Sequence, residues 1–268
     1  MAATAESGAA LADALGRSHD IAVVLGSGWG DAADAIGPVL AEVATKDVPG
    51  MPPPSVAGHS ARIRSVALDE QRAALVFLGR THLYEGRGVH AVAHTVRAAA
   101  AHGCRAVILT NGCGAINTAH SPGDVVLVSD HINLTGATAL AGPEFVDLTD
   151  LYSRRLRDIA RDVDSSLAEG VYVQFHGPQY ETPAEVVMSR IIGGSLVGMS
   201  TVLEAIAASH LGMRILGLSL ATNLAAGLGE GRLDGDHVVA VAEANAPYVA
   251  SLLHRIITTL AARRELVA

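Results

Sequence analysis

The segment RAALVFLGRTHLYEG, residues 72–86, contains the features from which the fold is predicted. Its first seven residues are apolar apart from the leading arginine and have the length of a buried strand, whereas the last eight are mainly polar. Side chains alternate along an extended chain, so Arg80, His82 and Tyr84 are expected to project to one side of the strand end. Together they predict a ligand site there. A strand end that is simply solvated is the alternative.

The chemistry of these three side chains indicates the kind of ligand. A guanidinium presents a planar fork that matches two phosphate oxygens. An imidazole adds a hydrogen-bonding group that titrates near neutral pH. A phenol offers an apolar face with a polar tip, which suits a sugar. The three side chains are therefore suited to a phosphate group and to a sugar.

Apolar runs of strand length followed by glycine or polar residues recur along the chain. Strands are predicted at residues 21–25, 61–68, 72–78, 105–110, 125–129, 170–175, 196–198 and 214–221. Helices are predicted at residues 1–18, with a loosely ordered start, and at 89–102, 202–211 and 236–264, the last with a break or kink at Pro247. This alternation predicts an α/β fold, in which residues 1–268 form a single domain with a central mixed, largely parallel sheet flanked by helices.

Polar or glycine-rich residues stand at the ends of many of these strands. They occupy positions 26–28, 79–84, 111–115, 199–200 and 222–223. Ligands of open α/β sheets bind at the carboxyl ends of the strands. We therefore expect these segments to converge on one crevice.

Two of the strand ends are rich in glycine. The sequence GSGWG at 26–30 connects a strand to an expected helix, an arrangement in which backbone N–H groups and Ser27 can meet an anion. Asp31 stands where the dinucleotide fingerprint G-x-G-x-x-G requires glycine, so a single phosphate is favoured over a dinucleotide. The sequence NGCGA at 111–115 is predicted to be a second turn of this kind.

A carboxylate precedes another predicted helix. Thr182 as N-cap, Pro183 at the first position and Glu185 at the third complete a capping box. Glu181, just before the cap, has no local partner, so its carboxylate is available to a ligand; a solvated loop acid is the alternative. Ser200 precedes a helix as well, either as a plain N-cap or as an anion contact.

Composition excludes several classes of protein. The chain has 19 basic and 27 acidic residues, a net charge of −8, which argues against a nucleic-acid partner. Its apolar runs stay shorter than the ~18 residues of a membrane span, and we expect neither a signal peptide nor a membrane partner. Two cysteines, Cys104 and Cys113, fit a reducing cytoplasm.

Two further features concern metals and interfaces. His90 and His94 have the spacing of metal ligands on a helix, but Ala91 stands where H-E-x-x-H has its acid and no third ligand is evident. We therefore expect no metal.

The stretch from 136 to 152 is irregular, which is typical of a functional loop or an interface.

Eight blocks of the sequence, in the same order, resemble the trimeric, low-molecular-mass purine nucleoside phosphorylases, especially the bacterial members. The blocks are VLGSG at 24–28, AGH at 57–59, GRTHLYEG at 79–86, LTNG at 109–112, SDHINL at 129–134, GPQYET at 177–182, VGMST at 197–201 and TN at 222–223. The resemblance extends from Ile21 to the C-terminal helix. It implies the nucleoside phosphorylase fold and a cytoplasmic homotrimer.

The resemblance also implies roles for individual residues. Phosphate would be bound by Ser27, His59, Arg80, His82, Ser200 and the backbone of Gly112. Ribose would contact Tyr84, Met199 and a Phe145 lent by the neighbouring subunit. The base would be flanked by Tyr180 and hydrogen-bonded by Glu181 and Asn223. Asn223, Glu181 and His82 would be the catalytic residues.

The implied reaction is phosphorolysis of 6-oxopurine ribonucleosides and deoxyribonucleosides, such as inosine and guanosine, to a free purine and the sugar 1-phosphate. Asn223 would donate to the ring nitrogen and the 6-oxo group, and Glu181 would accept the N1 proton, which stabilises the leaving purine as an oxyanion hole stabilises its oxyanion. A 6-aminopurine lacks that proton, so adenosine is disfavoured. Phosphate is a co-substrate, and no metal or organic cofactor is implied.

Two positions depart from the family. Ala115 replaces a usual glycine of the phosphate turn, and its added methyl group is either harmless or shifts the loop. Gly235 stands where a family histidine meets the ribose 5′-hydroxyl, and His237 stands two residues further on. Residues two apart lie on nearly opposite faces of a helix, so His237 is a poor substitute. We expect the 5′ contact to be lost or mediated by water.

Three other functions compete with this one. A methylthioadenosine phosphorylase is favoured by Gly235 but opposed by Glu181 and Asn223. A Rossmann oxidoreductase is opposed by Asp31. A nucleoside- or phosphate-binding protein without catalytic activity would keep the same pocket, and the sequence leaves it open, as it does the choice between inosine and guanosine.

Overall fold

The computed structural model describes residues 2–52, 60–229, 233–263 and 265. Its α-helices are α1 (Ala2–Leu15), α2 (Ala32–Ile36), α3 (Gly88–Val92), α4 (His94–His102), α5 (Arg154–Val163), α6 (Pro183–Ile191), α7 (Val202–His210) and α8 (Gly235–Ala262). Its strands are β1 (Ile21–Val24), β2 (Val39–Ala44), β3 (Arg62–Ala67), β4 (Ala73–Phe77), β5 (Ala106–Ala115), β6 (Val125–Asn133), β7 (Ala168–Gln174), β8 (Leu196–Gly198) and β9 (Arg214–Leu224). Two short 3₁₀ helices are η1 (Thr45–Asp47) and η2 (Leu83–Glu85).

The strands form one mixed sheet in the order β2-β3-β4-β1-β5-β8-β7-β6-β9. An additional parallel pairing joins β5 to β9 and closes the second half of the sheet into a ring. The first half, from β1 to β2, extends from this ring as an open sheet. The predicted α/β class with a central mixed sheet is therefore confirmed, with the added feature that part of the sheet is closed.

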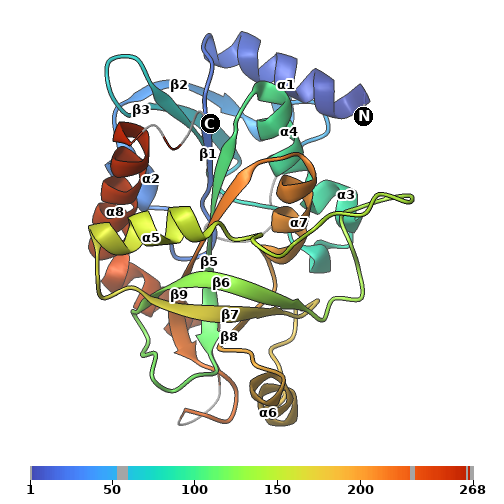
Figure 1. Cartoon of the computed structure of the whole chain (residues 1–268), viewed down its shortest axis with the longest axis vertical. Coiled ribbons are helices and arrows are strands. Elements are labelled where there is room, and N and C mark those ends of the chain that lie inside the picture. The colour runs from blue at the N-terminus through green and yellow to red at the C-terminus, as the bar shows by residue number, and fades with distance from the viewer. Residues whose placement is uncertain (1, 53–59, 230–232, 264, 266–268) are drawn as a thin grey trace.

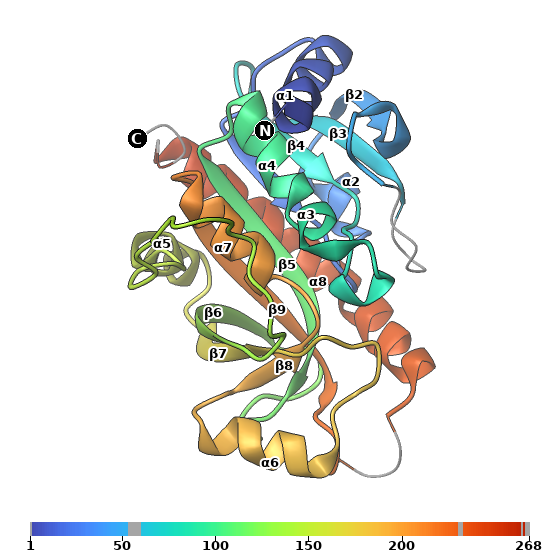
Figure 2. The ribbon, with the colours of Figure 1, turned by 90° about the vertical axis from the view of Figure 1, so that its right-hand side faces the viewer.

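Helices cover both sides of the sheet (Figure 1). Helices α2, α5 and α8 pack on one side, and α1, α3, α4 and α7 pack on the other. A separate apolar cluster lies under each layer, because the buried strands present alternate side chains to opposite faces. Helix α6 lies at one end of the molecule, away from both layers (Figure 2).

Strand β5 differs from the prediction at its carboxyl end. Residues 111–115 were expected to be a glycine-rich turn, but they belong to the strand. The reason is tertiary, since β9 pairs with β5 as far as Ala115 and Leu224. For the same reason Thr222 and Asn223 lie inside β9, beyond the predicted strand end at Ala221.

The predicted helix at 89–102 is also divided. It consists of two helices, because α3 ends at Val92 and α4 begins at His94, with Ala93 between them. His90 and His94 consequently belong to different helices, and each has another partner. His94 contacts Ser7 at 2.9 Å, and His90 contacts Arg97 at 2.9 Å.

Several elements were missed or extended. Strand β2 and helix α5 had no sequence prediction, and β6 continues four residues beyond its predicted end at Ser129. Of the break or kink predicted at Pro247, the break is excluded, because α8 continues through this proline. Of the helices within the described ranges, none combines the length and the apolar character needed to cross a membrane.

Strand direction positions the candidate site. Strands β4 and β9 run parallel to the adjacent β1 and β5, which are parallel to each other. Their carboxyl ends therefore reach the same edge of the sheet, as the sequence predicted. Residues at or just beyond all four of these ends line a single cavity.

Candidate active site

A cavity of about 150 Å³ lies at this edge of the sheet. It is lined by Ser27, His82, Tyr84, Asn111, Gly112, Cys113, Gly114, Tyr180, Glu181, Val197, Gly198, Met199, Ser200, Thr222, Asn223 and Val238. The strand ends and turns singled out in the sequence thus converge, although they are separated by up to about 200 residues of chain. The cavity includes nine of the predicted site residues.

One part of the cavity carries hydroxyl, imidazole and backbone groups. Ser27 follows β1, Gly112 lies in β5, and Ser200 precedes α7. A Cβ at Gly112 would lie 3.2 Å from the carbonyl oxygen of Ser27, so glycine allows the two segments to approach closely. His82 completes this group. Such a set of donors suits an oxyanion.

Arg80 does not line the cavity, although the sequence predicted that it projects with His82 and Tyr84. Its guanidinium lies behind the wall, where it forms an ion pair with Glu204 and donates to the carbonyl of Thr110. The regular strand ends at Phe77, Gly79 has a φ of 130°, and η2 begins at Leu83. Side-chain alternation therefore does not apply to this segment as expected.

An apolar wall lies beside these donors. The rings of His82 and Tyr84 stack, with centroids 4.8 Å apart and an angle of 15° between their planes. Burial raises the pKa of Tyr84 to about 12, so its hydroxyl is protonated at neutral pH. A Cβ at Gly177 would lie 2.5 Å from the sulfur of Met199 and 2.8 Å from the Tyr84 ring, so glycine is required here.

A carboxyl group forms a further part of the cavity. Glu181 is buried, and within the described residues its Oε1 atom has no hydrogen-bond partner. Burial, with a smaller contribution from Glu185, raises the pKa of Glu181. The capping box predicted for α6 is present, with Thr182 N donating to Glu185 at 2.7 Å. Because that box is complete without Glu181, its carboxyl group is left to the cavity.

Two further side chains complete this end. Asn223 donates from Nδ2 to the Leu224 carbonyl at 2.8 Å, while its Oδ1 accepts from Thr222 at 2.9 Å. An amide nitrogen has two hydrogens, so one contact leaves a second donor for a ligand. Tyr180 is partly exposed at the rim, where it can cover a planar group.

The remaining predicted residues lie elsewhere. His59 lies outside the described residues, as does the side chain of His237. Phe145 does not line the cavity; its side chain is 97% exposed. Ala115 is fully buried in the core rather than at the cavity. A Cβ built at Gly235 would meet open space.

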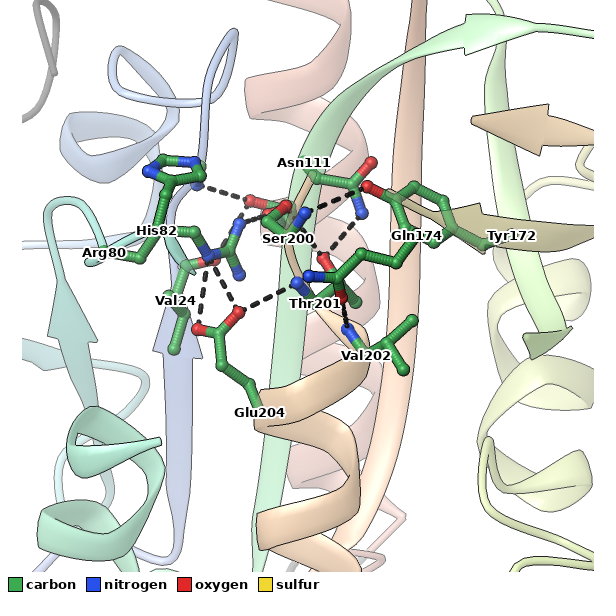
Figure 3. Close-up of polar contacts among 12 residues, drawn as sticks. Val24, Arg80, His82, Asn111, Tyr172, Gln174, Ser200, Thr201, Val202 and Glu204 are labelled. Atoms are coloured by element: carbon green, nitrogen blue, oxygen red, sulfur yellow. Dashed lines mark hydrogen bonds and ion pairs between the residues drawn. The ribbon is translucent and has the colours of Figure 1, made fainter. Parts of the chain in front are cut away.

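Sequence reasoning missed several residues that shape this site. Asn111, Thr201 and Glu204 form a buried polar group behind Ser200 (Figure 3). A signal for it was present, because Thr201 and Glu204 repeat the T-x-x-E spacing of a capping box. Among the described residues, no group of three or more histidine, cysteine or acidic side chains could hold a metal ion.

Known proteins resemble this chain in sequence and in fold. The sequence profile of the phosphorylase superfamily matches residues 20–258. A purine nucleoside phosphorylase from Cellulomonas sp is 55% identical over 248 residues, covering 91% of this chain and 88% of the relative. One from Mycobacterium tuberculosis is 48% identical over 248 residues, covering 92% of each chain. A crystal structure of Schistosoma mansoni purine nucleoside phosphorylase with inosine superposes with a TM-score of 0.87 at 28% identity, covering 96% of each chain.

Proposed function

The chain belongs to the phosphorylase superfamily and, within it, to the purine nucleoside phosphorylases, and we propose that it cleaves 6-oxopurine nucleosides with inorganic phosphate. The products are a free purine and ribose 1-phosphate or its deoxy form. Inosine and guanosine are the proposed substrates. The S. mansoni relative was crystallised with inosine and with adenosine, which supports purine nucleosides as the ligand class.

The observation that carries the proposal is the carboxyl group of Glu181. It is buried in the cavity and its Oε1 lacks a partner among the described residues. An unsatisfied buried acceptor destabilises the protein, which is expected where a ligand supplies the donor. The N1–H of a 6-oxopurine is such a donor. A 6-aminopurine has none there and would leave the carboxylate unpaired, so adenosine is a poor substrate.

The chemistry follows from the two ends of the cavity. A phosphate oxygen, held near Ser27, His82 and Ser200, forms a bond to C1′ of the ribose. The bond from C1′ to the purine nitrogen breaks, and its electron pair leaves with the purine. Asn223 donates to the purine as this negative charge develops, and Glu181 fixes N1–H. Donors placed before the reaction stabilise the transition state without reorganisation.

The proposal includes the assembly and the co-substrate. A fully exposed phenylalanine in an irregular loop supports a homotrimer in which Phe145 covers the ribose of the neighbouring subunit. Phosphate is the co-substrate, and we propose no metal or organic cofactor. Two buried free thiols, Cys104 and Cys113, are consistent with the cytoplasm as its location.

The test is release of hypoxanthine from inosine, measured with and without phosphate after dialysis against EDTA. Release that requires phosphate is the expected result. Release without phosphate would mean a hydrolase. An absence of release under both conditions, followed by cleavage of methylthioadenosine, would favour the methylthioadenosine phosphorylase. Binding without cleavage of either substrate would favour a binding protein.

The ribose 5′ end gives a further prediction. Val238 lines the cavity, and open space surrounds Gly235, where the family resemblance implies a histidine. We therefore expect 2′-deoxyinosine and 2′,5′-dideoxyinosine to be cleaved with similar kcat/KM. A large loss with the dideoxy compound would mean that another residue binds the 5′-hydroxyl.

A further inference from the structure

Glu204 lies in the first turn of α7, behind the cavity wall that Ser200 forms (Figure 3). Its side chain is completely buried. An ionised carboxylate is costly to bury unless it is paired and hydrogen-bonded. Glu204 meets both conditions through two groups from different parts of the chain. They are the Arg80 guanidinium and the backbone N–H of Thr201.

The first contact holds the turn that carries Ser200. Thr201 has φ 80° and ψ −50°, a conformation that β-branched residues rarely adopt. Val202 N donates to Ser200 O at 2.9 Å and closes a three-residue γ-turn. A strained turn of this kind persists only where its surroundings hold it. Glu204 Oε2 holds it by accepting from Thr201 N at 3.0 Å.

Two neighbouring side chains hold the same turn. Asn111 Nδ2 donates to Thr201 Oγ1 at 2.9 Å, and Gln174 Oε1 accepts from Val202 N at 2.9 Å. Asn111 comes from β5 and Gln174 from β7, so the turn is fixed from two strands of the ring. Ser200 Oγ is therefore presented to the cavity by a rigid backbone.

The second contact orients Arg80. Its Nε lies 3.0 Å from Glu204 Oε2 and 3.2 Å from Oε1, and its Nη1 donates to Thr110 O. The guanidinium is a rigid plane, so these contacts set its orientation. A Cβ at Gly26 would lie 2.4 Å from Nη1, which shows how closely the plane is enclosed.

We propose that Glu204 is a positioning residue for phosphate: one buried carboxylate fixes both the Arg80 guanidinium and the Ser200–Thr201 turn. This inference rests on the proposed function. It makes a prediction opposite to that of simple electrostatics. By Coulomb attraction alone, removing a negative charge beside Arg80 would tighten the binding of a phosphate dianion. If Glu204 acts by positioning, its removal weakens that binding.

The experiment compares the wild-type enzyme with Glu204→Gln, varying phosphate and inosine separately in steady-state kinetics. Glutamine keeps the size of the side chain and an acceptor for Thr201 N, but it carries no charge for Arg80. We expect the KM for phosphate to rise about tenfold or more, from loss of a charge-assisted hydrogen bond. The KM for inosine should stay within about twofold, because the groups that Glu204 holds, Arg80 and the Ser200–Thr201 turn, are proposed to serve phosphate and not the nucleoside.

A second variant covers the possibility that Glu204→Gln does not fold. Glu204→Asp keeps the charge for Arg80, but its side chain is shorter by one methylene and cannot hold both partners in place. It should raise the KM for phosphate selectively as well, though less. The control is Glu169→Gln in β7, which removes one charge from an ion pair with Arg157 and Arg161 outside the cavity. That variant should leave the KM for phosphate unchanged.

The outcomes separate this inference from the function itself. Wild-type enzyme without phosphate-dependent cleavage would overturn the proposed function. With wild-type activity present, the positioning role is wrong if the KM for phosphate falls in Glu204→Gln, or if both variants stay within about twofold of wild type. Equal increases in the KM for phosphate and for inosine would indicate a general structural defect and would also contradict it.

Discussion

At the scale of single residues, the site contains groups that oppose stability. Glu181 is a buried carboxyl group with one oxygen that has no hydrogen-bond partner in the described part of the chain, and Thr201 has a strained backbone. Strain and unsatisfied polar groups are usually retained where binding or catalysis uses them. The same two features thus lower the free energy of unfolding and prepare the site for its ligands. Substitutions at such positions are expected to move stability and activity in opposite directions.

Glu181→Gln should illustrate this. The pKa of Glu181 is raised by burial, so the native state disfavours its ionised form. That penalty is absent well below the ordinary pKa of a carboxyl group and is complete above the raised pKa. The variant should therefore be more stable than wild type at about pH 7.5, and the difference should shrink as the pH falls through the raised pKa. Urea unfolding at several pH values measures it; a variant less stable at about pH 7.5 would contradict it.

Gly26→Ala should be damaging for a steric reason. The added Cβ would lie 2.4 Å from Arg80 Nη1 and 2.5 Å from the Thr110 carbonyl oxygen. The carbonyl belongs to a central strand and cannot move away, so the backbone at residue 26 must shift, and the Arg80 guanidinium must move as well. We expect the free energy of unfolding to fall by about 1–3 kcal/mol and the KM for phosphate to rise. Thermal unfolding and kinetics test both, with Gly229→Ala, whose Cβ would make only ordinary contacts, as the neutral control.

At the scale of elements, pairing between strands decides where functional residues stand. β5 and β9 pair along their whole length, which draws the glycines of 111–115 and the residues Thr222 and Asn223 into the sheet. Rigid strands hold side chains more precisely than loops do. The two T-x-x-E helix starts act similarly, since each fixes the residue that precedes it, Glu181 before α6 and Ser200 before α7.

A buried histidine joins three elements and gives a prediction for acid stability. His19 lies before β1, with Nδ1 2.7 Å from His102 Nε2 at the end of α4 and Nε2 2.8 Å from Ser65 Oγ in β3. Burial first, then His102 and Arg17, lowers the pKa of His19 to about 4. A lowered histidine pKa gives stability that is complete above 6.5 and is lost as the pH falls through about 4.

The variant His19→Gln does not titrate at this position. Wild-type protein should therefore lose free energy of unfolding more steeply than the variant between pH 6.5 and about 4. Above that range the two curves should run parallel, which serves as the internal control. Urea unfolding at a series of pH values gives both curves. Parallel curves throughout would mean that His19 contributes nothing to acid sensitivity.

At the scale of the whole molecule, the predicted contact between Phe145 and ribose is not formed by the cavity of the same chain. Phe145 belongs to the irregular stretch before α5, and its side chain is almost completely exposed. An isolated exposed apolar side chain is ordinary. We propose that a second subunit receives this phenylalanine, because its side chain is 97% exposed and makes no contact with the cavity of its own chain.

Mixed assemblies test this proposal. Phe145→Ala subunits keep their own Glu181 but supply no phenyl ring to the neighbouring site. Glu181→Ala subunits supply the Phe145 ring but have inactive sites of their own. After unfolding and refolding together, some sites combine an intact Glu181 with a neighbour's Phe145, so the mixture should exceed the summed activity of the separate variants. Light scattering should give three times the 27.5 kDa chain. Activity equal to the sum would show that Phe145 acts within its own chain or not at all.

Much of this protein was predictable from the chain because the relevant forces are local. Apolar runs identified eight of the strands, capping chemistry placed the start of α6, and an isolated acid at Glu181 identified a candidate ligand group. Each of these patterns depends only on residues close together in the chain, so it can be recognised in a short segment of sequence. The division between α3 and α4 and the strand β2 were missed, since their causes lie in packing.

Contacts between distant segments were decided by the tertiary structure. The ring closure by β5 and β9 and the turning of Arg80 toward Glu204 join groups far apart in the chain. The strained turn at Thr201 is local, but the side chains of Asn111 and Gln174 that hold it come from distant strands. Glu204 is 124 residues from Arg80. A residue type can indicate a charge or a hydrogen bond, but it does not specify the partner. Partner choice follows from how the whole chain excludes water and pairs its buried polar groups.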